Sequence, residues 1–539
     1  MAIDRFAARQ LSLAALAAVI FVAWMHPAIL DVRNVGWLLD GSDRGQTAIG
    51  LAAYLRGGSW PALHNPLLLA PEGLPLSLTD SNPLLGLLCR PLGLPADWQV
   101  IGWWLLVCVV LQVAFANALL RRHVADPLAL FLGTALVSFS PTLIARYGHV
   151  NLCAHWTILW ALWIFVDETR AKQPAWWMAV IGVSLLIHPY LAVMTGAIWA
   201  SAVIRLIILH RDRSSIMIAA GAVAASVLAI AWWLGLIGQS LVSSGTYGRF
   251  GIALDGLWNP GNPDYSALLP GVAASPAQGF EGFNYLGAGM LVLVALAVIA
   301  LLFGRGRSAG LSLTWLIPAF GAFALIAIGP HLIWRGQVIA SIPVAAGLRD
   351  ALDPVRAAGR LFWPVGYVIA LTAVVIVARL PRGALMIGGA LALQVIDLAP
   401  MLAAVRATSA RADDHRLYLR TRDPRWQSII DRASAIEFYP IRSDREKAVV
   451  EELAWRAITA PRPVLLRYFY ASREPAAVAA RLDADAAAFR AGRIDRSRLY
   501  VLLDGRASGA LAGRVTIIDG LAVIVPDAAV IPSSPRSAS

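Results

Sequence analysis

The stretch GWLLDGSDRGQTAIGLAAYLRGGSWPALHNPLLLAPEGLPLSLTDSNP, residues 36–83, lies between two apolar segments of the chain. It is too polar to cross a membrane, and it alternates a short amphipathic helix with proline-rich turns. Asp40 and Asp43 follow the first apolar segment, and Asp80 precedes the second. We therefore interpret this stretch as a folded loop that holds half of an active site at a membrane surface.

Apolar residues make up 58% of the 539-residue chain, and charged residues only 14%. Soluble globular proteins carry about 25% charged residues, so the composition indicates a polytopic α-helical membrane protein. The formal net charge is +12, but the basic residues lie in short clusters between apolar runs, which indicates membrane topology and not nucleic-acid binding. We expect about eleven transmembrane helices, at residues 11–30, 98–120, 127–145, 152–166, 174–188, 190–209, 215–237, 285–303, 309–329, 361–378 and 383–403.

Basic residues cluster in alternate connections between these segments. Lys and Arg near the ends of spans mark the cytoplasmic side of a membrane. The N-terminus is therefore expected inside the cell and the C-terminal region outside. The clusters are Arg5 and Arg9, Arg121 and Arg122, Arg170 and Lys172, Arg211 and Arg213, Arg305 and Arg307, and Arg379 and Arg382.

The composition changes after about residue 405, where charge rises and strand-like and helical patterns alternate. This alternation predicts a small extracytoplasmic α/β domain. We expect strands at 435–439, 464–470 and 499–503, helices at 445–458 and 475–491, and a hairpin of 515–519 with 521–525 around Gly520. The predicted division is a transmembrane domain at 1–404 with outer loops 31–97, 238–284 and 330–360, the α/β domain at 405–526, and a disordered tail at 527–539.

Asp43 begins a predicted helix that a Gly-Gly pair ends, and its apolar residues repeat as in a helix lying on a membrane. Asp43 could cap that helix, with Gln46 completing a capping box. At the outer end of a span, Asp43 or Asp40 could instead act as a base on a substrate that arrives within the membrane. Asp80 precedes another short helix and is either a cap or a substrate ligand.

Three arginines, Arg349, Arg356 and Arg360, lie on the expected outer side. Basic residues are usually rare on that side, so their presence there calls for an explanation. Arg356 and Arg360 are four residues apart and would share a face of a helical turn. Two guanidinium groups on one face suit the oxygens of a phosphate. The alternatives are snorkelling to the membrane surface and ion pairs with the two aspartates of the same segment.

Further polar side chains lie at the outer ends of the middle spans and in the outer loops. Ionisable groups at membrane depth are functional candidates, and hydrogen bonding to a phosphate or sugar is expected, with plain interface anchoring as the alternative. His149 and His155 lack the helical spacing of metal ligands, so zinc is not expected there, and no residue is assigned as a metal ligand. The candidates are Arg146, Tyr147, His149, Asn151 and His155; His188 and Tyr190; Gln394 and Asp397; and Tyr247, Arg249 and Glu281.

Several short motifs, spread over most of the chain, resemble the GT-C superfamily of membrane glycosyltransferases and, more closely, a bacterial branch of it. The motifs are Asp43-x-x-Gln46, Asp80-Ser81-x-Pro83, His149-x-Asn151-Leu152-x-x-His155-Trp156, Glu281-Gly282-Phe283-Asn284-Tyr285-Leu286-Gly287 and Arg356-x-x-Gly359-Arg360-Leu361-Phe362-Trp363-Pro364. The resemblance implies a multi-pass protein of the bacterial inner (plasma) membrane, with a cytoplasmic N-terminus and a periplasmic C-terminal domain. It also implies a sugar donor linked to polyprenyl phosphate and an extracytoplasmic acceptor, which is a cell-envelope glycan, a lipid or a protein.

The resemblance further implies that Asp43, or else Asp40, is the catalytic base of an inverting transfer. The resemblance leaves two alternatives open, transfer without a cofactor and transfer assisted by a divalent cation (Mg²⁺ or Mn²⁺). An alternative is a flippase or exporter of a lipid-linked saccharide, which would use the same arginines without a base; a third class is a non-catalytic scaffold. The donor phosphate is assigned to Arg356, Arg360, Arg349, His188 and Tyr190, and the remaining substrate contacts to Asp80, Gln46, His149, Asn151, His155, Tyr247, Arg249 and Glu281.

Overall fold

The computed structural model describes residues 2–238, 240–261, 263–275, 278–304, 313–506 and 509–527. Arg305, Arg307 and most of the predicted tail lie outside these residues. The chain separates into two compact units, which are described separately below. Unit 1 comprises residues 1–27, 103–230 and 243–409, and unit 2 comprises residues 28–102, 231–242 and 410–539.

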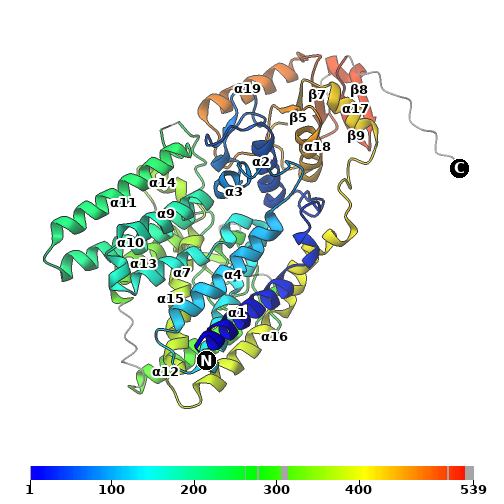
Figure 1. Ribbon diagram of the computed structural model, residues 1–539. Coiled ribbons are helices and arrows are strands. Elements are labelled where there is room, and N and C mark those ends of the chain that lie inside the picture. Colours follow the sequence, from blue (N-terminus) through cyan, green and yellow to red (C-terminus); the bar gives the residue numbers. More distant parts are fainter. Residues whose placement is uncertain are drawn as a thin grey trace. The chain divides into compact units, whose positions relative to one another are not determined.

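Unit 1 is built mainly from helices (Figure 1), and its described residues include one β-hairpin. Proline at the first turn starts several of these helices, as expected for a residue whose missing N–H would have no partner there. The elements are α1 (Ala2–Trp24), α4 (Ile101–Leu120), α5 (Pro127–Ser138), α6 (Pro141–Ile144), α7 (Trp156–Phe165), α8 (Glu168–Ala171), α9 (Pro174–Ile187), α10 (Pro189–Leu209), α11 (Arg213–Trp233), α12 (Ala288–Leu302), α13 (Ile317–Ile328), β3 (His331–Trp334), β4 (Gln337–Ser341), α14 (Ala346–Leu352), α15 (Trp363–Ala378) and α16 (Gly383–Ala410).

Within the described residues, seven helical stretches are long and apolar enough to cross a membrane, and four further apolar helices are shorter. The long stretches are 7–24, 101–120, 127–148, 189–209, 213–233, 358–378 and 383–414, and the shorter ones are 150–165, 174–187, 288–302 and 313–328. They correspond one to one with the predicted apolar segments, so the α-helical polytopic class is confirmed. The first helix ends at Trp24, short of the predicted residue 30, because Pro27 starts a separate 3-10 turn.

Ion pairs gather three of the basic clusters at one end of unit 1. Arg122 and Arg170 both bind Asp167, at 2.6 and 3.0 Å. Glu168 binds Lys172 at 2.7 Å and His210, next to the Arg211 cluster, at 3.0 Å. The connections after α4, α7 and α10 therefore share one end of the bundle, as the alternation of basic residues requires.

Unit 2 combines the first loop with the C-terminal region. Its sheet has five strands, in the order β6 (Leu465–Leu466), β5 (Ala435–Tyr439), β7 (Leu499–Leu502), β9 (Leu521–Ile524) and β8 (Val515–Ile518). Strand β5 is parallel to both β6 and β7, and β9 is antiparallel to β7 and β8. The predicted small C-terminal α/β domain is thus confirmed. The elements of unit 2 are α2 (Asp43–Gly57), β1 (His64–Asn65), β2 (Leu74–Pro75), α3 (Pro83–Cys89), α17 (Arg425–Arg432), β5 (Ala435–Tyr439), α18 (Lys447–Thr459), β6 (Leu465–Leu466), α19 (Ala476–Arg490), β7 (Leu499–Leu502), β8 (Val515–Ile518) and β9 (Leu521–Ile524).

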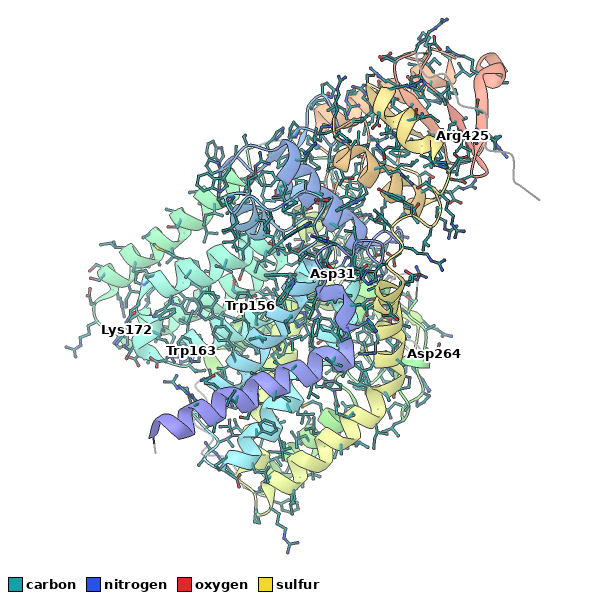
Figure 2. The ribbon with its side chains drawn as sticks, turned by 45° about the vertical axis from the view of Figure 1, so that its right-hand side comes forward. Asp31, Trp156, Trp163, Lys172, Asp264 and Arg425 are labelled. Atoms are coloured by element: carbon teal, nitrogen blue, oxygen red, sulfur yellow. The ribbon has the colours of Figure 1, made fainter. Side chains whose placement is uncertain are left out.

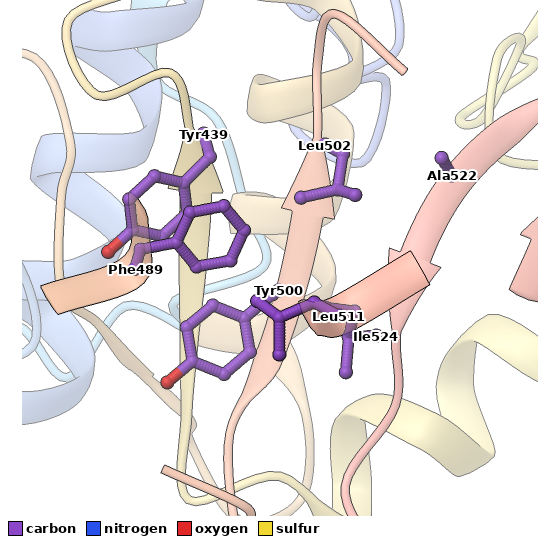
Figure 3. Close-up of a cluster of buried hydrophobic side chains, with 7 residues drawn as sticks. All are labelled: Tyr439, Phe489, Tyr500, Leu502, Leu511, Ala522 and Ile524. Atoms are coloured by element: carbon purple, nitrogen blue, oxygen red, sulfur yellow. The ribbon is translucent and has the colours of Figure 1, made fainter. Parts of the chain in front are cut away.

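Aromatic side chains form the core between the sheet and α19 (Figure 3). The rings of Tyr439 on β5 and Phe489 on α19 stack at 3.9 Å with 13° between their planes. Tyr500 on β7 packs 5.7 Å from Phe489. Full burial of such a side chain contributes about 1.5–3 kcal/mol, so this cluster fixes α19 on the sheet.

Helix α2 is buried within unit 2, so its predicted position on a membrane surface is wrong. Every residue from 44 to 55 is buried, and α18 and α3 pack against the helix. The buried residues include the polar side chains of Arg44, Gln46 and Thr47, so no polar face is left for water. The sequence division placed residues 31–97 with the membrane helices, whereas residues 28–102 group with residues 410–539 in the structure.

Candidate active site

A buried carboxylate lies at the centre of the polar groups of unit 1. Glu281 sits in the 3-10 turn Phe280–Gly282, shortly before α12. Its Oε2 accepts hydrogen bonds from Arg146 Nη1 at 2.6 Å and from Arg360 Nε at 2.7 Å. Its Oε1 is bound by Arg360 Nη2 and lies 3.0 Å from His149 Nε2. The four side chains, here called the arginine centre, join three segments that are distant in the sequence.

Glycines allow these segments to approach closely. Gly359 donates its N–H to the carbonyl of Phe250 at 2.9 Å, and its own carbonyl accepts from Asn284 Nδ2 at 3.0 Å. A Cβ at Gly282 would collide with the carbonyl of Gly251. Two of the motifs quoted above, the one at Glu281 and the one at Arg360, are thus held together by backbone contacts that a larger side chain would exclude.

The arginine centre carries an excess of positive charge, because two guanidinium groups share one carboxylate. Burial alone would raise the pKa of Glu281, but Arg360 and Arg146 outweigh that effect and hold the pKa well below its usual range. The guanidinium of Arg360 lies 4.9 Å from the ring centroid of Tyr190, and that of Arg146 lies 5.5 Å from that of Trp363. Such cation–π contacts add to the ion pairs that hold both guanidinium groups in place.

His188 and Tyr190 adjoin this centre. His188 ends α9 in an extended conformation and caps α10, its Nδ1 accepting the N–H of Tyr190 at 3.2 Å. The hydroxyl of Tyr190 accepts the N–H of Ala357 at 2.7 Å. His155 lies behind Trp363, with ring centroids 4.3 Å apart, and its Nδ1 is 2.9 Å from the hydroxyl of Tyr367. His155 therefore packs against Trp363, the ring that Arg146 contacts. Asn151 is buried as well.

The predicted pairing of Arg356 with Arg360 on one helical face is wrong. Ala357, with φ −79° and ψ 58°, interrupts the helical turns on either side, so only Arg360 joins the centre. Arg356 is half-buried and Arg349 is exposed. Asp353 accepts hydrogen bonds from the N–H groups of Ser244 and Thr246.

The other outer-loop candidates make local contacts. The hydroxyl of Tyr247 lies 3.4 Å from the carbonyl of Ile326, and exposed Arg249 lies 5.9 Å from the ring centroid of Phe250. Asp397 binds the hydroxyls of Ser266 and Tyr285 and fixes the segment that enters α12. Asp397 thus has a structural role in the loop that carries Glu281.

Three candidate acidic residues, Asp40, Asp43 and Asp80, lie at the first turn of α2. Asp40 Oδ1 accepts from Ser42 Oγ at 2.6 Å, and Asp40 Oδ2 binds buried Arg44 at 2.5 Å. Ser42 is the N-cap, and half-buried Asp43 follows in the first turn, so Asp43 does not occupy the capping position that was its alternative role. A carboxylate at this position is stabilised by the positive end of the helix dipole.

Asp80 lies beside the same turn. Thr47 Oγ1 donates to the carbonyl of Asp80 at 3.0 Å, and Ser81 Oγ donates to the carbonyl of Thr47 at 2.9 Å. Asn82, and not Asp80, caps α3. Gln46 is buried, and its Oε1 lacks a hydrogen-bond partner in the described part of the chain. Asp80 thus lies beside the turn that carries Asp40, Asp43 and Gln46. The spacing of these residues in the sequence does not predict that contact.

Sequence patterns do not reveal the roles of two candidate residues, Arg146 and Glu451. Arg146 belongs to a predicted polar cluster, but nothing in the sequence predicts its pairing with Glu281. The signal that marks it is an arginine inside an apolar run. Glu451 on α18 gave no local signal, yet its carboxyl reaches Gly41. Within the described residues, no group of three or more His, Cys, Asp or Glu side chains is arranged to hold a metal ion.

The helices and the buried polar centre define a multi-pass membrane protein with a small appended α/β domain. Residues 14–399 match the family described as "Domain of unknown function (DUF6311)", and residues 425–526 match the "DUF6311 C-terminal domain". The chain therefore belongs to the DUF6311 family. A search of the curated proteins finds no match.

Two solved structures of an oligosaccharyltransferase from Archaeoglobus fulgidus are similar to this chain. One, tethered to an acceptor peptide, has a TM-score of 0.38 and 13% identity, and the match covers 85% of this chain and 64% of that one. The other, in complex with an inhibitory peptide and a dolichol-phosphate, has a TM-score of 0.35 and 14% identity and covers 78% and 57%. The chain thus spans about three fifths of those proteins, and similarity at this level supports no statement about activity.

Proposed function

We propose that the protein is a membrane glycosyltransferase of the GT-C type, which moves a sugar from a polyprenyl-phosphate donor to an extracytoplasmic acceptor. The observation that carries the proposal is the arginine centre, where Arg146 and Arg360 share the single carboxylate of Glu281. A phosphate monoester is the leaving group of such a donor, and buried guanidinium groups stabilise the charge that develops on it. The motif resemblance described above agrees with this chemistry.

In this proposal a carboxylate of the first loop is the base, as the motif resemblance implies. Asp43 takes the proton of the acceptor hydroxyl as that oxygen attacks C1, and the bond from C1 to the phosphate oxygen breaks. Asp40 is the weaker candidate, because its carboxylate is bound to Arg44 and Ser42. Since no second carboxylate is assigned as a nucleophile, the reaction is a single displacement that inverts C1.

The proposed orientation places the arginine centre outside the cytoplasm. Arg146 and Arg360 lie at the ends of the stretches 127–148 and 358–378 that are opposite to the basic connections at Arg122 and Arg379. Because basic connections mark the cytoplasmic side, the centre is expected on the outer side of a bacterial inner membrane.

Single cysteines at Lys172 and Asp264 test this orientation. The two residues lie on opposite sides of unit 1 in the view of Figure 2. The native cysteines are buried, so their background reaction is small. A membrane-impermeant thiol reagent is expected to label Asp264→Cys in intact cells and Lys172→Cys only after the membrane is opened. The reverse pattern would contradict the orientation.

The function itself is tested by turnover of defined donors. Purified protein is incubated with a panel of polyprenyl-phosphate sugars and envelope extract as the acceptor source. The expected result is release of the polyprenyl phosphate together with transfer of one sugar. Movement of an intact lipid-linked saccharide across a vesicle membrane, without release of the carrier, would instead support an exporter and overturn the proposal.

A further inference from the structure

A carboxyl of the C-terminal domain is inserted beside the acidic turn. Glu451, on α18, is 2% exposed, and its Oε2 accepts the N–H of Gly41 at 2.6 Å. Its Oε1 is also buried and has no hydrogen-bond partner in the described part of the chain. The carboxyl lies against Gly45 of α2, where a Cβ would overlap it. Gly45 on α2 therefore leaves the space that the carboxyl of Glu451 on α18 occupies.

The charges around Glu451 oppose its ionisation. Asp40 and Asp43 face it from the acidic turn, together with the guanidinium of Arg44. On its own helix, Lys447 pairs with Asp444. Burial raises the pKa of Glu451 to about 9, the two aspartates act in the same direction, and the Gly41 N–H and Arg44 act against them. Glu451 is therefore a neutral acid at pH 7.

The neighbouring Glu452 has a different environment. It is equally buried, but its oxygens accept hydrogen bonds from the N–H groups of Leu419, Arg420 and Thr421. Glu452 thus anchors the chain before α17, while Glu451 points to the turn of Asp40 and Asp43. Glu452 is therefore a structural carboxylate, whereas Glu451 binds the turn that carries the candidate base.

We infer that Glu451 is a positioning residue for the proposed transfer reaction, and that its neutral carboxyl holds the Asp40–Asp43 turn through Gly41. This inference rests on the proposed function in assigning the turn a catalytic base. In the neutral form Glu451 fixes the backbone two residues before Asp43 without adding a third negative charge. When its proton passes to solvent at higher pH, the new carboxylate repels Asp40 and Asp43 and loosens the turn.

Hydrogen exchange of residues 38–46 tests the inference without any assay of transfer. In the wild-type protein, the protection factors of these amides are expected to fall about ten-fold between pH 7 and pH 9.5, after correction for intrinsic exchange. Glu451→Gln, which mimics the neutral acid, is expected to remove this fall. Exposed Glu446→Gln is the matched control and is expected to follow the wild type. Equal pH dependence in Glu451→Gln and wild type would overturn the inference.

The pH profile of transfer is the second readout. The ratio of the rate at pH 9.5 to the rate at pH 7 is expected to be about ten-fold higher in Glu451→Gln than in wild type. The same ratio in both proteins would show that Glu451 serves folding only and would overturn the positioning role. A wild-type protein that turns over no donor while its exchange still depends on Glu451 would count against the proposed function and leave the proton-dependent turn in place.

Discussion

Replacing Asp43 with asparagine is expected to lower glycosyl transfer by about 10²- to 10⁴-fold while the protein remains folded. Asparagine has the same shape but cannot accept the proton of the acceptor hydroxyl, and a general base contributes a factor of that size. Asp43 is half-buried in the first turn of α2, where loss of its charge costs about 0.3–1 kcal/mol through the helix dipole. Initial rates and thermal unfolding in detergent measure the two effects separately.

Two further variants make this prediction specific. Asp31→Asn changes an exposed aspartate in the same unit, whose Oδ1 accepts the N–H of Arg33, and is expected to keep the wild-type rate. Asp40→Asn breaks the ion pair with buried Arg44 and is expected to lower the unfolding midpoint. Full activity in folded Asp43→Asn, with loss in Asp40→Asn at an unchanged midpoint, would move the base to Asp40.

Replacing Arg360 with alanine is expected to lower transfer by about 10²- to 10³-fold, the factor typical of a lost donor to a developing negative charge. The variant is expected to fold, because Glu281 keeps Arg146 at 2.6 Å and His149 at 3.0 Å. Glu281→Gln is the opposite case, because it leaves two buried guanidinium groups without their carboxylate. Breaking a buried pair in this way costs about 3–5 kcal/mol, so its unfolding midpoint is expected to drop.

The control for Arg360→Ala is Arg335→Ala, which removes an exposed arginine from the turn between β3 and β4. It changes the net charge equally but leaves the arginine centre intact, and the wild-type rate is expected. Equal losses in the two variants would mean that general charge, and not the arginine centre, controls activity.

The contribution of Glu281 to stability is present above the ordinary pKa of a glutamate and is lost only as the pH falls through its depressed value. In the wild type, Glu281 therefore stays ionised across pH 6–8.

Local patterns in the sequence predicted most of the fold. The apolar runs gave the membrane helices, and the alternation after residue 405 gave β5, α18, α19 and β7 nearly at their observed bounds. These features depend on neighbours within one helix or strand, which the sequence records directly. Caps were less predictable, since Ser42 and Asn82 took roles that nearby Asp43 and Asp80 could also have filled.

The candidate site depended on contacts that no local pattern records. The Glu281 pairs span 135 residues to Arg146 and 79 residues to Arg360. Glu451 reaches Gly41 across 410 residues. The residue types were visible in the sequence, but the partners were not, because burial and pairing are set by tertiary packing. The buried position of α2 escaped prediction for the same reason, since its neighbour α18 lies near the other end of the chain.

Binding of a polyprenyl phosphate tests the central claim, that the arginine centre is the phosphate site of a lipid-dependent transferase. Native mass spectrometry compares a polyprenyl monophosphate with the uncharged polyprenol on the wild type and on Arg360→Ala. The wild type is expected to prefer the monophosphate by at least about ten-fold, equivalent to about 1.4 kcal/mol, and Arg360→Ala is expected to lose that preference. Equal binding of the two lipids by the wild type, or an unchanged preference in Arg360→Ala, would contradict the claim.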